Sequence, residues 1–113
     1  MPSAPFKFLH FAASLRRINK RYKLADQKEV LVLESVLSAH AEKVSFSVLD
    51  LILLNEIASQ ATLHSVMSNL ITKKLIKAET SKEDGRRKYV IPTKLALEWL
   101  QDCSDLLCSA PQK

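Results

Sequence analysis

The chain has 113 residues, of which 47% are hydrophobic, and it carries a formal net charge of +5 with a single glycine. This length is typical of one domain, and so little glycine leaves few positions for sheet turns or flexible linkers, which favours helices. No apolar run reaches the ~20 residues that a membrane-spanning helix needs. The two cysteines, Cys103 and Cys108, cannot form a disulfide framework, so we expect a protein of the reducing cytoplasm.

Basic residues are segregated along the chain. Residues 1–25 hold six Lys or Arg and no acid, and residues 61–94 hold eight Lys or Arg against three acids. The segments 26–60 and 95–113 are net acidic. Two separate basic blocks favour a polyanionic partner, although a charge run taken alone is also typical of a solvated face.

The first expected element is a basic amphipathic helix within residues 1–23, running from about Phe6 to Tyr22. Its lack of acids is also typical of targeting or membrane-surface segments, but its aromatic residues follow the spacing of a packed helix face. A second helix begins after Asp26 and extends to about Ala41, with Glu29 placed as in a capping box.

The remaining elements follow in quick succession. We expect a short strand at 44–46, a helix at 48–58 capped by Ser47, a turn at 59–60, a helix at 61–74, strands at 75–80 and 88–91, and a helix at 93–108 capped by Thr93. Pro92 ends the strand pairing because it has no N–H to donate. The order α-α-β-α-α-β-β-α predicts one mostly α winged helix-turn-helix domain, with the helix-turn-helix and wing over residues 44–92.

The helix at 61–74 has two unlike sides. Leu63, Val66, Met67 and Leu70 fall together at 100° per residue and form the core face. The opposite side lacks acids and bulky apolar groups, whereas most surface helices carry Glu and Lys there. Such a side is either an ordinary polar face or one that approaches phosphates and base edges in the major groove. We predict DNA contacts from Ser59, Gln60, Ala61, Thr62, His64, Ser65, Ser68 and Asn69.

The tip of the hairpin is basic and contains Gly85, which can turn the chain with a positive φ. An arginine at such a tip can enter a narrow minor groove, and Asp84 could brace it. We predict DNA contacts from Lys82, Arg86, Arg87 and Lys88. A solvated loop is the alternative.

The run Ser59-Gln60-Ala61-Thr62-Leu63, followed by Leu70, Leu75-Ile76, Asp84-Gly85-Arg86-Arg87 and Thr93, resembles the winged helix of MarR-type bacterial transcription regulators over residues 44–97. The resemblance implies that residues 60–69 read the major groove and that Arg86 or Arg87 reaches the minor groove. It further implies a homodimer held by the first and last helices on a pseudo-palindromic site, with a small-molecule effector pocket between those helices and the DNA-binding lobe. The chain departs from the family pattern at Lys74, where a glycine usually ends the recognition helix, at Pro92, where a leucine is usual, and in its short last helix.

Other chemistries find little support in the sequence. No His, Cys, Asp or Glu spacing suggests a metal site, and no glycine-rich loop or nucleophile motif is present, so we predict no enzyme and no cofactor. Neither cysteine has a basic neighbour in the sequence to activate it, so packing or exposure is expected rather than oxidant sensing. Two other functions stay open: a winged-helix module that binds another protein, and a membrane or RNA contact through the first helix.

Overall fold

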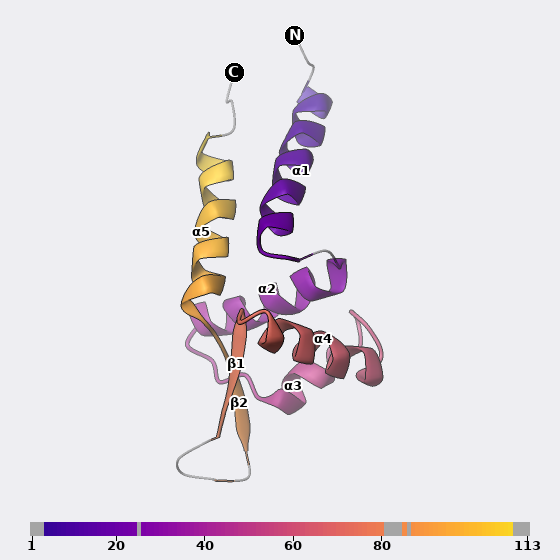
Figure 1. The fold of residues 1–113 in the computed structure, drawn as a ribbon, viewed down its shortest axis with the longest axis vertical. Coiled ribbons are helices and arrows are strands. Elements are labelled where there is room, and N and C mark those ends of the chain that lie inside the picture. The colour runs from indigo at the N-terminus through magenta and orange to yellow at the C-terminus, as the bar shows by residue number, and fades with distance from the viewer. Residues whose placement is uncertain (1–3, 25, 81–84, 86, 110–113) are drawn as a thin grey trace.

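The computed structural model describes residues 4–24, 26–80, 85 and 87–109. Its elements are α1 (Ala4–Arg21), α2 (Gln27–Ala41), α3 (Val48–Ile52), α4 (Gln60–Thr72), β1 (Ile76–Thr80), β2 (Lys88–Pro92) and α5 (Lys94–Ser109) (Figure 1). The molecule is elongated, with α2, α3, α4 and the hairpin forming one lobe and the pair α1 and α5 projecting from it. Within the described ranges, no helix is both long and apolar enough to cross a membrane.

Helix α2 is the centre of the lobe. Val32, Leu33 and Val36 are almost completely buried, and the helix packs against α4 and β2. Asp26 caps it as predicted, since its Oδ1 accepts the Lys28 N–H at 2.9 Å. Glu29 does not take the predicted capping-box role, because its carboxylate contacts Asn69 and Lys73 at the end of α4 instead.

Helix α3 is shorter than predicted. It begins with a complete capping box, in which Ser47 Oγ accepts the Asp50 N–H and Asp50 Oδ2 accepts the Ser47 N–H, both at 3.0 Å. It ends at Ile52, and tight turns follow, so the prediction of a helix to residue 58 is wrong. These turns leave Leu54 and Ile57 partly buried against the core.

The short strand predicted at 44–46 is reduced to a single bridge between Ser47 and Tyr89. The neighbouring Val90 N–H donates to the Phe46 carbonyl at 2.7 Å, and α3 begins at Val48 before more pairs can form. β1 and β2 are antiparallel, from Ile76 opposite Pro92 to Thr80 opposite Lys88. Pro92 is the last residue of β2, but pairing does not stop there as predicted, because the Thr93 N–H still donates to the Leu75 carbonyl at 3.1 Å.

Helices α1 and α5 lie side by side and run in opposite directions (Figure 1). Two hydrogen bonds join them: Tyr22 Oη donates to Asp102 Oδ2 at 2.6 Å, and Trp99 Nε1 donates to Asn19 Oδ1 at 2.8 Å. The bond to Asp102, followed by burial, raises the pKa of Tyr22 to about 12. Trp99 is 3% exposed and belongs to the hydrophobic core.

Three helices end in a lysine with left-handed backbone. Lys23, Lys43 and Lys74 have φ of 63°, 58° and 63°. Each takes the place after the helix that usually belongs to glycine. At Lys74 the bonds are those of a Schellman motif: its N–H donates to the Ile71 carbonyl at 2.9 Å and the Leu75 N–H to the Leu70 carbonyl at 3.0 Å. The lysine at position 74, where the MarR-type pattern has a glycine, therefore still allows the usual helix C-terminus.

The strain at Lys74 can be measured. We expect Lys74→Gly to raise the free energy of unfolding by about 0.5–1 kcal/mol, because glycine adopts positive φ without the steric cost of a Cβ. Urea denaturation at one pH is the measurement. The control is Lys74→Ala, which keeps the Cβ and should leave stability nearly unchanged. Equal stability of the glycine and alanine variants would show that this backbone is not strained.

Candidate nucleic-acid interface

Helix α4 starts at a well-formed cap. Ser59 Oγ accepts the Thr62 N–H at 3.3 Å, and its hydroxyl lies 3.1 Å from Thr62 Oγ1. This cap explains why Thr62 is half-buried although it belongs to the predicted DNA-contacting set. The helix begins at Gln60, one residue before the predicted start.

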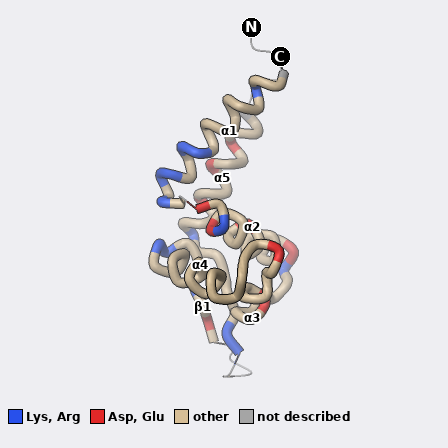
Figure 2. Tube along the Cα trace, turned by 90° about the vertical axis from the view of Figure 1, so that its right-hand side faces the viewer, with Lys and Arg blue, Asp and Glu red and all other residues tan. Residues whose placement is uncertain are grey.

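The two predicted sides of α4 are present in the structure. Leu63, Val66 and Leu70 are buried, and Met67 packs partly against the same core. The predicted contact residues on the exposed side are Ser59, Gln60, Ala61, His64, Ser65, Ser68 and Asn69. No acid interrupts the helix (Figure 2). Small polar groups on an acid-free surface allow the helix to approach a phosphate backbone closely.

The end of α4 is held by a buried acid from α2. Glu29 is 5% exposed; its Oε2 accepts from Asn69 Nδ2 at 3.3 Å, and its Oε1 forms an ion pair with Lys73. Asn69, a predicted base reader, is therefore oriented by α2. Sequence reasoning missed this role of Glu29, and the available signal was an acid within the first turn of an otherwise apolar helix.

The hairpin is fixed to the same end of α4. Thr93 Oγ1 donates to the Lys74 carbonyl at 2.7 Å and accepts the Ala96 N–H at 3.3 Å, so one hydroxyl joins the end of α4 to the start of α5. This confirms the predicted cap at Thr93. We define the wing as β1, β2 and the tip between them. Its root, where it joins α4 and α5, thus has a fixed position relative to α4.

The described part of the wing tip is basic. Arg87 and Lys88 are exposed, and they line an open groove of about 800 Å³ with Ser47 and Asp50 at the start of α3. Lys82, Asp84 and Arg86 lie outside the described residues. Gly85 lies in a turn, but the positive φ predicted for it is absent, since a seven-residue connection does not require one.

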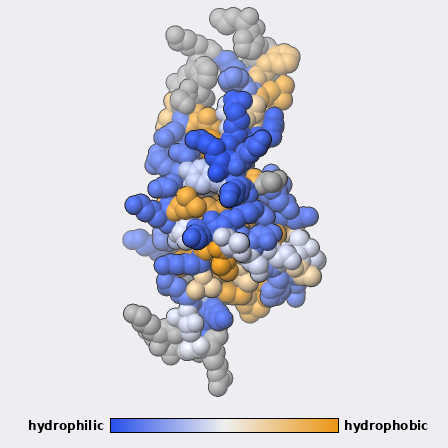
Figure 3. All heavy atoms as spheres, in the orientation of Figure 1, coloured by the Kyte–Doolittle hydropathy of each residue, from blue (hydrophilic) through white to orange (hydrophobic). Residues whose placement is uncertain are grey.

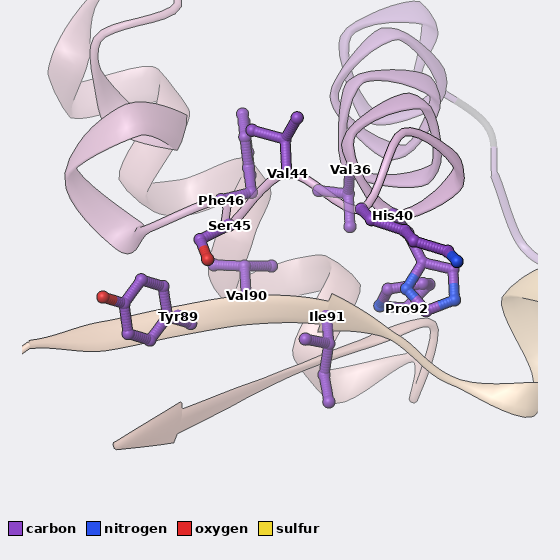
Figure 4. Close-up of a pocket in the computed structure, with 10 residues that line it drawn as sticks. Val36, His40, Val44, Ser45, Phe46, Tyr89, Val90, Ile91 and Pro92 are labelled. Atoms are coloured by element: carbon purple, nitrogen blue, oxygen red, sulfur yellow. The ribbon is translucent and has the colours of Figure 1, made fainter. Parts of the chain in front are cut away.

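A small cavity of about 220 Å³ lies where the wing meets α2 (Figure 4). The segment from Val44 to Phe46 passes over β2, and Val90 points toward it while Ile91 points away. Val90 is 3% exposed, so this contact fastens the middle of β2 to the lobe. The wing is thus held at its root by the contacts of Thr93 and along β2 by the packing of Val90.

Groups that could support other chemistry are sparse. Among the described residues, no three His, Cys, Asp or Glu side chains are grouped so that they could hold a metal ion. Burial, with the charges of Asp102 and Glu34, raises the pKa of the Cys103 thiol to about 11, which keeps it protonated at neutral pH. Cys108 is exposed.

These elements define a winged helix-turn-helix: α3 and α4 form the helix-turn-helix, and the β1–β2 hairpin is the wing.

Solved structures confirm this fold and the expected likeness to MarR-type regulators at the level of the fold. MepR of S. aureus in complex with DNA superimposes with a TM-score of 0.76 at 14% identity, over 92% of this chain and 74% of that one. MepR bound to ethidium bromide gives 0.62 at 14% identity, over 95% and 76%. The transcriptional regulator PA4135 gives 0.61 at 15% identity, over 97% and 79%. No protein-family model and no curated protein matches the chain.

The Glu29 contact yields a stability prediction with an internal control. We expect Glu29→Ala to lower the free energy of unfolding by about 1–3 kcal/mol, because it leaves Lys73 and Asn69 without their partner. Glu79→Ala removes the carboxylate of an exposed pair, whose Lys77 Nζ–Glu79 Oε1 distance is 3.2 Å, and should cost less than about 1 kcal/mol. Urea denaturation compares the two variants, and equal losses would contradict a special role for Glu29.

Proposed function

We propose that this protein binds double-stranded DNA sequence-specifically through α4 and the wing, and that it regulates transcription as a homodimer. One observation carries the proposal: α4 buries one side in the core and presents an acid-free row of small polar side chains beside the root of a basic hairpin. A helix of this kind fits the major groove, and the basic hairpin beside it suits the neighbouring backbone or minor groove. The DNA-bound structure of MepR and the regulator PA4135, which share the fold, add support.

In this proposal the contacts divide by chemistry. The exposed side chains of α4, among them Gln60, Ser65 and Asn69, read base edges, since amide and hydroxyl groups can match base donors and acceptors. The wing residues Arg86 and Arg87 hold the backbone or minor groove, and Lys82 and Lys88 add charge. The proposed site of action is the cytoplasm.

A homodimer is supported by the projecting helix pair. Phe6, Phe8 and Leu9 on α1 and Leu107 on α5 are each more than half exposed, at 57–66%. Hydrophobic side chains gather at the far end of the pair (Figure 3). Exposed apolar surface on this scale marks an interaction site, and most soluble oligomers pair copies of one chain.

The same pair borders a largely apolar groove of about 410 Å³. Phe11, Leu15 and Trp99 line it together with residues of α2. We propose it as the site of a small apolar effector. MepR, which shares this fold, has been solved bound to ethidium bromide, a small aromatic compound.

The wing is tested by Arg86→Ala/Arg87→Ala. We expect weaker binding to every duplex and a slope of log affinity against log salt that is smaller by up to about 2 for each subunit bound. Fluorescence anisotropy over a salt series is the measurement. Lys43→Ala/Lys94→Ala removes equal charge from exposed positions outside α4 and the wing, and should leave the slope unchanged. Unchanged affinity of the arginine variant at low salt would remove the wing from the proposal, and no duplex binding by the wild-type protein would favour a protein-interaction module.

The dimer is tested by sedimentation. We expect the wild-type protein to sediment at twice its chain mass of 12.7 kDa, and Phe8→Glu/Leu107→Glu to sediment as a monomer, because two charges would have to be buried in the contact. Leu49→Glu/Leu53→Glu, at exposed apolar positions in α3 and directly after it, is the matched control and should leave the dimer intact. Circular dichroism verifies that each variant keeps its helices. A monomeric wild-type protein would overturn the dimer.

A further inference from the structure

The basic half of α1 is the largest charged feature that α4 and the wing do not include. Arg16, Lys20 and Lys23 are exposed, and none of them forms an ion pair with a described residue. A spacing of four residues places Arg16 and Lys20 on one side of α1, with about 6 Å of rise between them. Lys23 follows the helix and lines the same groove as these two residues. Arg17 and Arg21 flank this row.

These three bases line a groove of about 420 Å³ between the end of α1 and the start of α2. We call it the basic groove; Asn19, Leu24, Asp26, Gln27 and Val30 complete its lining. Its one acid, Asp26, is engaged as the cap of α2, since Oδ1 accepts the Lys28 N–H at 2.9 Å. The groove therefore presents a net positive charge of about two to its surroundings, which suits anionic oxygens.

The position of the basic groove connects it to α4. Gln27 lines the groove, and Glu29, two residues further on, contacts Asn69 and Lys73 at the end of α4. Figure 2 shows the basic segments of α1 and those at the end of α4 on the same side of the molecule. In Figure 3 the hydrophilic side chains form a continuous area from α1 across the start of α2.

We propose that the basic groove binds the phosphate backbone of duplex DNA that flanks the segment read by α4. This inference rests on the proposed DNA-binding function and extends its footprint beyond the helix-turn-helix and wing. Arg16 and Lys20 supply the charge, while Asn19 and Gln27 offer amide donors to phosphate oxygens. The contact contributes affinity and register but carries no base specificity.

The test compares two duplexes that share one central sequence, one of about 40 base pairs and one trimmed to about 20, which still holds two half-sites one helical turn apart. On the long duplex, Arg16→Gln/Lys20→Gln should reduce the slope of log affinity against log salt by about 2 for each subunit bound, one unit for each phosphate contact. On the short duplex the same variant should match the wild-type protein. Lys43→Gln/Lys94→Gln removes the same charge elsewhere and should behave as wild type on both, and Arg16→Lys/Lys20→Arg should keep the wild-type slope.

Each other outcome counts against the proposal. An equal slope for Arg16→Gln/Lys20→Gln and the control on the long duplex overturns it, even where Arg86→Ala/Arg87→Ala weakens binding and the proposed function stands. Loss of binding to phosphatidylserine–phosphatidylcholine vesicles in Arg16→Gln/Lys20→Gln, without a change in DNA slope, assigns the groove to a membrane surface instead. A wild-type protein that binds neither duplex at low salt overturns the proposed function together with this inference.

Discussion

The burial of one side of α4 against α2 is the constraint on which the rest of the structure depends. Leu63, Val66 and Leu70 are at most 3% exposed, and each contributes about 1.5–3 kcal/mol relative to an exposed side chain. Rotating α4 by one residue position, about 100°, would expose this row and bury polar groups without partners. The outward direction of His64, Ser65 and Ser68 follows from that cost. The candidate reading surface is thus a consequence of the core.

Apolar packing leaves α4 some freedom to slide along α2, and polar contacts remove it. The Glu29 carboxylate meets both Asn69 and Lys73, and Thr93 Oγ1 meets the Lys74 carbonyl. A buried ion pair adds less to stability than its Coulomb attraction suggests, because both charges lose hydration. The Glu29–Lys73 ion pair instead fixes the position of α4, because a shift of the helix by a few ångströms would separate the two charges inside the protein. These contacts at the C-terminal end of α4 therefore fix the position of that end and of the wing that follows it.

Features determined by nearby residues could be predicted from the sequence, and those that depend on distant partners could not. Ser59 and the apolar spacing of α4 act within a few residues, and α4 and the wing strands were predicted to within one residue at most ends. The end of α3 was missed because Leu54 and Ile57 keep an apolar pattern while tertiary packing turns them inward. Glu29 finds its partners 40 and 44 residues away, and no local pattern contains that information. The DNA-contacting residues remain predictions, because such contacts depend on a partner outside this chain.

The fold also places on one side of the molecule basic segments that are separated in the sequence. The basic blocks 1–25 and 61–94 are separated by an acidic stretch in the chain, yet the basic segments of α1 and of the end of α4 lie on one side, while an acidic segment of α3 lies toward the opposite edge (Figure 2). Potentials of exposed charges fade over roughly 8 Å at physiological salt, so each face acts on a partner mainly at short range. A polyanion is attracted by the basic side and repelled by the acidic one, which restricts its approach to the side that carries α4. The basic half of α1 can thus favour the same approach direction as α4 without reading a base.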